Sequence, residues 1–169
     1  MCWYALAVHA RQEKAACREL TQRGIEVFLP TAFTRRQWSD RVQRIELALF
    51  PGYLFVRVAL SAARRVELLR ARHTVDLVGR LPGDDRVARA IPEIEIESIR
   101  KIVLSRREMD PVDALMTGTP VVVVAGPLRG ARGVVETAPD GRRRLAVQIS
   151  LLGRGVRTLL SADDVLETA

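Results

Sequence analysis

The stretch that most constrains the fold is residues 47–57, which read Leu-Ala-Leu-Phe-Pro-Gly-Tyr-Leu-Phe-Val-Arg. A run with so little charge is typical of a buried central strand. Pro51 and Gly52 interrupt the run, and inside a strand these residue types mark a bulge, a bend or a close backbone approach. We therefore expect the chain to bend at these two positions and to continue directly into a central strand.

Beyond the bend, aromatic and aliphatic side chains alternate. Tyr53 and Phe55 fall on one face of the strand, and Leu54 and Val56 fall on the other. An aliphatic face suits a core, whereas an aromatic face with a hydroxyl group suits a surface that docks a partner. The alternative is that both faces are core, because apolar side chains usually lie inside a protein.

The composition is that of a folded protein: 169 residues, 48% hydrophobic and 28% charged. Residues 1–10 lack the basic start and the long apolar run of a signal peptide, and no apolar run approaches the ~20 residues that span a bilayer. We therefore expect a cytosolic chain without membrane contact. Cys2 and Cys17 lie in no CxxC or Cys/His cluster, so we interpret them as reduced thiols and expect no metal or other cofactor.

The positive charge is confined to the N-terminal part. Residues 1–106 carry 19 Lys+Arg against 12 Asp+Glu, a net of +7, and residues 107–169 carry 8 of each. All but two of the cations are arginine, which suits phosphate contacts because of its fixed fork of donors. Localised positive charge indicates a nucleic-acid partner. A solvated surface is the alternative.

Residues 1–106 show the pattern β-α-β-β-α-β followed by a helix, which is the order of a ferredoxin-like domain. The strands are expected at 3–8, 25–33, 45–58 and 74–79, and the helices at 11–23, from Ser61 to Arg72, and from Pro92 onward. Ser61 is the expected N-cap of the second helix, and Gly24 the stop of the first.

Two basic features accompany this pattern. Arg11, Lys14 and Arg18 are spaced i, i+3 and i+7, so they make one stripe on the first helix. Residues 34–44 carry four arginines around Trp38, and we expect an exposed hairpin arm there. Such a cluster could stack on bases or lie on phosphates. A mobile, solvated loop is an equal alternative.

The C-terminal part follows a linker, which we expect at 107–116 because the sequence there is charged, contains proline and has no clear period. Residues 117–169 show five short strands separated by tight turns, which predicts a small β-barrel. The spacing of Gly126, Gly130 and Gly133 matches neither GxGxxG nor a P-loop, so turn geometry explains these glycines better than phosphate binding.

These residues together resemble the NusG-type transcription elongation factors over nearly the whole chain. Trp3-Tyr4, the helix at 11–24 and Phe50-Pro51-Gly52-Tyr53 match the family's N-terminal NGN domain. The C-terminal segment is similar to an SH3-like KOW domain. Its matching residues are Gly118, 121–124, Gly126, Pro127, Gly130 and 133–135. Residues 36–41 and 49–56 look more like the specialised RfaH-like and UpxY-like antiterminator paralogues, which act on long operons.

The resemblance implies a non-enzymatic factor that docks on the β′ clamp helices of RNA polymerase, can also reach the β-subunit side of the cleft, and suppresses pausing or termination. The implied polymerase-docking residues are Tyr4, Phe50, Pro51, Tyr53 and Phe55. The residues implied to face the non-template DNA strand are Arg11, Lys14, Arg18, Arg72 and His73. A monomer is expected.

The resemblance also implies a second contact, to a ribosomal protein or Rho, through the KOW domain. Leu128 and Arg129, at the expected tip of a turn, are the candidate residues, although family members often carry Phe where Leu128 stands. Some RfaH-like relatives refold this domain into helices. We expect no such switch here, because the β-branched run at 121–124 and the glycines disfavour helix.

A competing hypothesis is an RNA-binding or ribosome-associated protein, since KOW domains also occur in ribosomal proteins. The zero net charge of residues 107–169 argues against that part as the RNA binder. An enzyme is disfavoured, because two histidines and no nucleophile, metal or phosphate-loop motif assemble no catalytic constellation.

Overall fold

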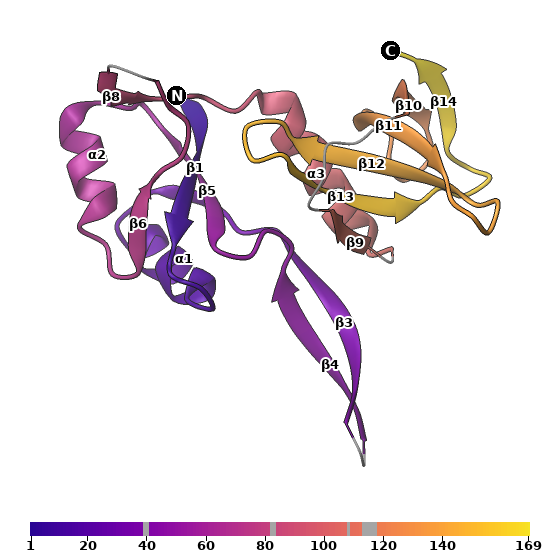
Figure 1. The fold of residues 1–169 in the computed structure, drawn as a ribbon, viewed down its shortest axis with the longest axis horizontal. Coiled ribbons are helices and arrows are strands. Elements are labelled where there is room, and N and C mark those ends of the chain that lie inside the picture. Colours follow the sequence, from indigo (N-terminus) through magenta and orange to yellow (C-terminus); the bar gives the residue numbers. More distant parts are fainter. Residues whose placement is uncertain (39–40, 82–83, 108, 113–117) are drawn as a thin grey trace.

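The computed structural model describes residues 1–38, 41–81, 84–107, 109–112 and 118–169. The N-terminal and C-terminal parts lie side by side, and a hairpin arm projects away from the body between them (Figure 1). Of the expected linker, residues 108 and 113–116 lie outside the described residues. Ser39 and Asp40, at the tip of the expected arm, also lie outside them.

The N-terminal sheet has the strand order β2-β5-β1-β6, and all neighbouring strands are antiparallel. Its elements are β1 (Cys2–Val8), α1 (Glu13–Gln22), β2 (Glu26–Phe28), β5 (Tyr53–Val58), α2 (Ala62–Leu69) and β6 (Thr74–Leu77). This order is that of the predicted ferredoxin-like arrangement. The apolar stretch that constrains the sequence is therefore a central strand, β5, as expected.

Local signals set the ends of the helices. The Ser61 hydroxyl accepts a hydrogen bond from the Arg64 amide at 3.1 Å, so the predicted N-cap of α2 is confirmed. Gly24 has a φ of 76°, a conformation that glycine adopts at little cost, and it follows the end of α1. The helix α1 begins at Glu13 rather than at Arg11, because Arg11 has a φ of 64° and lies outside the helical region.

Helices α1 and α2 cover one face of the sheet. Leu6 of β1 and Leu54 and Val56 of β5 are fully buried there against Leu20 of α1 and Leu68 of α2. Burying such a side chain contributes roughly 1.5–3 kcal/mol. The aliphatic face that the sequence predicts is therefore a helix-covered core.

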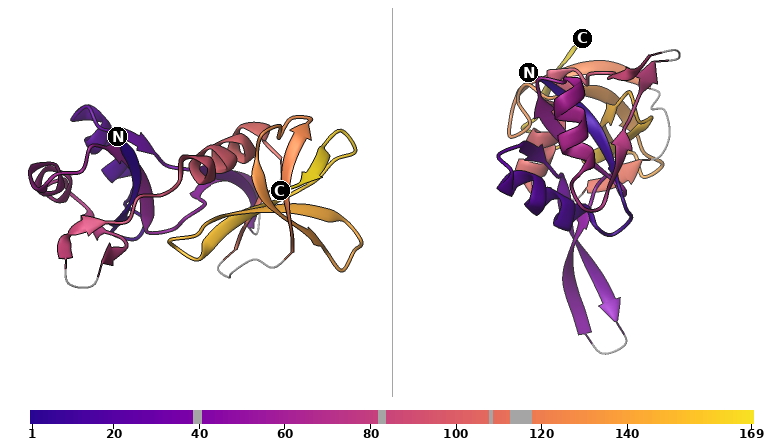
Figure 2. Two further views of the ribbon diagram at one scale, coloured as in Figure 1. Left: turned by 90° about the horizontal axis from the view of Figure 1, so that it is seen from above. Right: turned by 90° about the vertical axis from the view of Figure 1, so that its left-hand side faces the viewer.

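The arm consists of β3 (Thr31–Trp38) and β4 (Arg41–Ala48), paired antiparallel over their whole length. Beyond its base, which contacts α1 through Lys14 and Glu46, the arm projects away from the rest of the molecule (Figures 1 and 2). The sequence predicted continuous strands over 25–33 and 45–58, and that was wrong. Pro30 separates β2 from β3, and the bend at Pro51-Gly52 separates β4 from β5. Both breaks follow from the cost of proline inside a strand.

The C-terminal part is an antiparallel sheet in which the described strands have the order β14-β10-β11-β12-β13-β9. Its strands are β9 (Met109–Val112), β10 (Thr119–Ala125), β11 (Arg132–Thr137), β12 (Arg143–Ile149), β13 (Arg154–Leu159) and β14 (Val165–Thr168). The five strands predicted from 117 onward are present. The segment that we expected to be a linker contributes a further strand, β9, which pairs with β13.

The third helix, α3 (Glu93–Ser105), lies against the C-terminal sheet and also reaches the N-terminal one (Figures 1 and 2). A short hairpin, β7 (Arg80–Leu81) and β8 (Asp84–Ala88), precedes it. One side of α3 buries Ile96, Ile99 and Ile102 completely in an apolar cluster that joins both parts of the chain. The helix is therefore shared between the two parts rather than confined to the first.

Candidate docking face and nucleic-acid interface

The bend before β5 is fixed to two neighbouring elements. The Tyr53 amide donates to the Phe50 carbonyl at 3.0 Å, which closes the turn, and Gly52 has a φ of 81°. The Gly52 amide donates to Oε1 of Glu13, at the start of α1, at 2.8 Å. The Gly52 carbonyl accepts from the Val8 amide at 2.9 Å. The bend therefore has one defined position relative to β1 and α1.

The aromatic side chains behind the bend pack on one another. Phe50 and Phe55 meet edge to face at 5.4 Å between ring centroids, and Phe28 lies 6.2 Å from Phe55. Trp3 of β1 joins through Phe28 at 6.4 Å. Edge-to-face and tilted pairs of this kind add roughly 0.5–1.5 kcal/mol beyond their area. Phe50 and Phe55 are 1% and 0% exposed, so in this arrangement they are core.

Other parts of the chain cover this aromatic face, which consists of Trp3, Phe28, Phe50, Tyr53 and Phe55. Helix α3 supplies the carboxylate of Glu93, which accepts from Nε1 of Trp3 at 3.1 Å. It also supplies Arg100, whose guanidinium lies 5.5 Å from the Trp3 ring and 5.1 Å from the Phe28 ring. Strand β13 supplies its first residue, Arg154, whose guanidinium lies 5.5 Å over the ring of Tyr53.

The five expected docking residues are therefore not equivalent. Tyr53 is half-buried beneath Arg154, and Pro51 is exposed. Phe50 and Phe55 support the face from within. Tyr4 lies on the opposite, helix-covered face with Leu6, so it cannot share one docking surface with Tyr53. Burial, and then the neighbouring Cys2, raise the pKa of the Tyr4 hydroxyl above its ordinary value.

The expected nucleic-acid residues divide into two groups. Lys14 and Arg18 are exposed on α1, but Arg11 precedes the helix, so the three do not form one helical stripe. Arg72 and His73 lie in the turn after α2. The His9 amide donates to the His73 carbonyl at 2.8 Å, which joins that turn to the one before α1. The Arg72 amide donates to Glu19 of α1 at 2.8 Å.

Lys14, one of the expected nucleic-acid residues, already forms an ion pair. Nζ of Lys14 lies 2.6 Å from Oε2 of Glu46 at the base of the arm, and Oε1 of Glu46 accepts from Thr31 at 2.6 Å. The hydrogen bond from Lys14, followed by that from Thr31, holds the pKa of Glu46 below its ordinary value. The side chains of Lys14 and Glu46 are 52% and 36% exposed, so solvent screens the pair and it contributes little to stability.

In the C-terminal sheet, Leu128 is fully buried and Arg129 is exposed. Both residues lie in the expected turn, but the side chain of Leu128 packs into the apolar cluster because it is the only large apolar side chain of that turn. Of the pair, Arg129 alone reaches solvent. The turn is held by the Arg129 amide, which donates to the Gly126 carbonyl at 3.1 Å.

The expected turn residues Gly118, Gly126, Pro127, Gly130 and Gly133 lie at or beside β10 and β11. Gly126 has a φ of 93°, and a Cβ there would lie 2.6 Å from the Asp163 carbonyl oxygen. At Gly133 a Cβ would collide with the backbone carbonyl of Ala146 on the neighbouring strand. Both glycines are therefore required by close backbone approach, as the turn interpretation predicts.

Sequence reasoning did not find Arg100, Arg154 or the ion pair of Arg107 with Asp164. In a chain with so many arginines, nothing in the pattern distinguishes these from solvated ones. The ion pair joins residues that are 57 positions apart, and both guanidinium nitrogens of Arg107 contact the carboxylate. Such pairings depend on how the two parts of the chain meet, which no local period encodes.

Among the described residues, no three His, Cys, Asp or Glu side chains gather as metal ligands would. None of the described helices has the length and apolar character that crossing a bilayer requires. Cys2 and Cys17 are free thiols, and burial is the main cause that raises the pKa of Cys17 above its ordinary value.

A model of the family described as "Transcription termination factor nusG" matches residues 1–100. Because that match spans more than half of the sequence, the chain belongs to the NusG family, a family of transcription factors. Proteins named "Transcription termination/antitermination protein NusG" are similar along their length. Those of Helicobacter pylori and Pseudomonas aeruginosa are each 24% identical, over 91% and 96% of both chains.

A solved structure described as "Domain interaction in Thermotoga maritima NusG" has the same fold. It aligns over 99% of this chain and 96% of that chain, with a TM-score of 0.51 and 18% sequence identity. The α+β fold class, an NGN-type domain followed by a KOW-type sheet, is thereby confirmed.

Proposed function

We propose that this protein is a transcription elongation factor that docks on the β′ clamp helices of RNA polymerase through the aromatic face and acts in antitermination. Membership of the NusG family and the names of its relatives support a role in termination or antitermination. A factor of this kind works in the cytoplasm. The two antiterminator-like stretches, 36–41 and 49–56, favour a specialised paralogue.

The observation that carries the proposal is the way the aromatic face is covered. Helix α3 packs on it, so the face already accommodates the shape of a helix. Its polar contacts with that face are few: one hydrogen bond to Trp3, an ion pair between Arg57 and Glu93 at 3.5 Å, and the stacking of Arg100. We propose that a helical hairpin of the polymerase takes the place of α3 on this face, and that the apolar contacts of Ile96, Ile99 and Ile102 with it are exchanged for contacts with the partner.

The test is binding of the full chain to core RNA polymerase, compared with the Tyr53→Ala variant. Truncating an aromatic anchor at the centre of an interface costs about 2 kcal/mol, so the dissociation constant should rise roughly 30-fold. Tyr53→Phe keeps the ring and should bind within about threefold. Unchanged affinity of Tyr53→Ala, with unchanged thermal unfolding, would remove the aromatic face from the docking site.

Arg154 provides a second prediction, because its guanidinium covers the ring of Tyr53 and its Nη1 donates to the Pro51 carbonyl at 3.4 Å. A cation–π contact at a partly exposed site is worth about 1 kcal/mol. If docking needs an uncovered Tyr53, Arg154→Ala should raise polymerase affinity about fivefold. Arg142→Ala, on the turn between β11 and β12, is the control and should change nothing. Weaker binding of Arg154→Ala would mean that Arg154 itself contacts the polymerase.

The KOW-type part is proposed to recruit a second partner, a ribosomal protein or Rho, with Arg129 as the exposed candidate contact. Leu128 supports that turn from the core. An RNA-binding function of the same part is the competing proposal, and exposed Arg129, Arg132 and Arg142 favour it locally. Tight, salt-sensitive RNA binding that Arg129→Gln and Arg142→Gln abolish would support the competing proposal.

A further inference from the structure

The Gly52 peptide, in the bend before β5, is bound by two different elements. Its amide donates to Oε1 of Glu13 at 2.8 Å, and its carbonyl accepts from the Val8 amide at 2.9 Å. Glu13 is the first residue of α1, and Val8 is the last residue of β1. Gly52 lies between exposed Pro51 and half-buried Tyr53, so a rotation of its peptide moves both neighbours. The orientation of these two docking residues therefore depends on the two hydrogen bonds.

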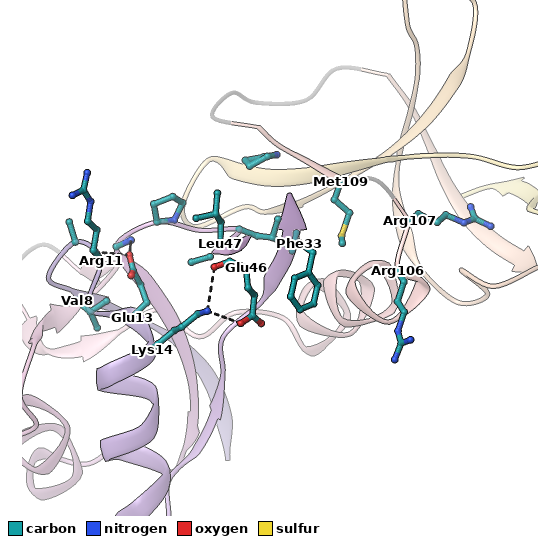
Figure 3. A pocket seen from close by; sticks show the side chains of 17 residues that line it. Val8, Arg11, Glu13, Lys14, Phe33, Glu46, Leu47, Arg106, Arg107 and Met109 are labelled. Atoms are coloured by element: carbon teal, nitrogen blue, oxygen red, sulfur yellow. Dashed lines mark hydrogen bonds and ion pairs between the residues drawn. The ribbon is translucent and has the colours of Figure 1, made fainter. Parts of the chain in front are cut away.

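Side-chain packing does not enclose the bend on every side. A groove of about 1330 Å³ opens beside it, where the arm meets the body, and Glu13, Pro51 and Gly52 line this groove (Figure 3). Gly52 has no side chain to pack, and glycine has access to more backbone conformations than any other residue. A glycine beside an open groove is held by its hydrogen bonds rather than by packing.

The carboxylate of Glu13 is buried, although no cation pairs with it among the described residues. The residue is 7% exposed, and its Oε1 also accepts from the Arg11 amide at 3.3 Å. A buried charge without a cation is costly unless hydrogen bonds satisfy it. Ala16 and Leu20 anchor α1 in the core, where both are fully buried. The Gly52 amide therefore meets an acceptor with a fixed position.

The next residue of α1 holds the other end of the same segment. Nζ of Lys14 contacts Oε2 of Glu46 at 2.6 Å and the Glu46 carbonyl at 3.3 Å (Figure 3). Glu46 and Gly52 lie at the two ends of the segment that leads from the arm into β5. The pair of Lys14 and Glu46 is screened by solvent, whereas Glu13 is buried, where a hydrogen bond is stronger. Glu13 therefore makes the firmer of the two attachments.

The C-terminal part holds the bend from another side. Arg154 lies over the ring of Tyr53, and its Nη1 donates to the Pro51 carbonyl at 3.4 Å. Under the proposed function, the polymerase takes the place of this cover. The hydrogen bond from Gly52 to Glu13 remains when Arg154 leaves, because both of its partners belong to the N-terminal part.

We propose that Glu13 is a positioning residue for polymerase docking, which keeps Pro51 and Tyr53 in the geometry that the polymerase binds. This role rests on the proposed function and adds to it a residue outside the aromatic face. Glu13 acts by preorganisation. Without its acceptor, docking must also order the bend, and that ordering weakens binding.

The test measures binding of the full chain to core RNA polymerase. Glu13→Ala should raise the dissociation constant about tenfold, because the Gly52 amide loses its acceptor and the bend loses its orientation. Glu13→Gln keeps a carbonyl oxygen for that amide and should bind within about threefold of the parent. Glu19→Ala is the matched control. It removes another α1 carboxylate that accepts from a backbone amide, that of Arg72, and should change the affinity less than about twofold.

A combination with Tyr53→Ala separates positioning from a general loss of structure. If Glu13 acts through the bend, the double variant should bind about 30-fold more weakly than the parent, as Tyr53→Ala alone does. Independent effects would multiply to roughly 300-fold and would overturn the positioning role. Normal binding of Glu13→Ala beside weak binding of Tyr53→Ala overturns the role of Glu13 alone. Normal binding of both variants overturns the docking face, and the role of Glu13 with it.

Amide hydrogen exchange of the free chain tests the local cause without polymerase. In Glu13→Ala the Gly52 amide should exchange at least about tenfold faster. The Ile25 amide, which donates to the Leu20 carbonyl beyond the end of α1, should be unchanged. If Glu13→Ala does not fold, Glu13→Asp replaces it with the same expected losses, since its carboxylate is one methylene short of the Gly52 amide. Unchanged exchange of Gly52 in a folded variant would show that Glu13 does not hold the bend.

Discussion

A C-terminal piece that begins at Pro92 is expected to fold cooperatively, whereas a piece that begins at Arg107 is expected to lose most of its stability. The difference is α3, whose Ile96, Ile99 and Ile102 are fully buried. At roughly 1.5–3 kcal/mol for each side chain, the loss is about 5 kcal/mol or more. That equals the whole stability of many small domains.

Polar contacts add to the attachment of α3. The Ser98 hydroxyl accepts from the Arg132 amide at 2.9 Å, and Glu95 accepts from the amide and the hydroxyl of Ser150 at 3.1 and 2.7 Å. The Ser98 contact holds α3 to β11, and the Glu95 contacts hold it to the end of β12. We therefore propose that the C-terminal folding unit begins at Pro92, and not at 117 as the change of sequence pattern suggests.

Urea unfolding of the two pieces, followed by far-UV circular dichroism, measures this difference. Within the longer piece, Ile99→Ala should cost about 2–5 kcal/mol because it leaves a cavity. Leu104→Ala on the same helix is the matched control, since Leu104 is 72% exposed, and it should cost under about 0.5 kcal/mol. Equal stability of the two pieces would show that α3 belongs to the N-terminal part alone.

The alternation of apolar side chains, together with residues that cap helices or form turns, predicted most of the helices and strands. The period of two in residues 53–56 placed Leu54 and Val56 on a helix-covered core, and Ser61 and Gly24 marked helix ends correctly. These signals work because they depend on neighbours in the chain. The bend at Pro51-Gly52 was found for the same reason.

The candidate site was predicted less completely, because it depends on contacts between distant segments. No local pattern shows that Arg154 covers Tyr53, or that β9 pairs with β13 inside an apparent linker. The prediction placed Tyr4 on the docking face, although the alternation of side chains along β1 predicts the opposite face. Ala5 pairs with Phe55 and shares its face, so its neighbour Tyr4 lies on the helix-covered face. That error was avoidable, whereas the covering of the aromatic face required the structure.

The second large effect on stability is expected for Asp164. This residue lies in the turn that connects β13 to β14, and its side chain is completely buried. Its carboxylate accepts from Arg107, from the Ser161 amide at 2.9 Å and from the Ser161 hydroxyl at 3.0 Å. Arg107 also donates to the Leu159 carbonyl at 3.1 Å, so the chain two residues beyond the end of α3 is tied to the end of β13. Asp164→Asn should cost about 3 kcal/mol, because it leaves the guanidinium without its charged partner.

The charge of Asp164 also predicts how this cost depends on pH. Burial tends to raise the pKa of Asp164, but the hydrogen bonds from Arg107 and Ser161 and the charge of Arg107 outweigh burial, and the pKa lies below its ordinary value. A carboxyl group with a lowered pKa in the folded state stabilises fully above its unfolded pKa of about 3.9. That contribution is lost as pH falls through the folded value.

Urea unfolding of the parent and of Asp164→Asn should therefore differ by about 3 kcal/mol at pH 7, and by progressively less below about pH 4. Asp140→Asn removes an exposed carboxylate that lies 4.0 Å from Arg142, so it should cost under about 0.5 kcal/mol at either pH. A difference for Asp164→Asn that stays constant from pH 7 to pH 3 would mean that Asp164 acts only as a neutral hydrogen-bonding group. In that case the ion pair would not be what holds the end of α3 to the C-terminal sheet.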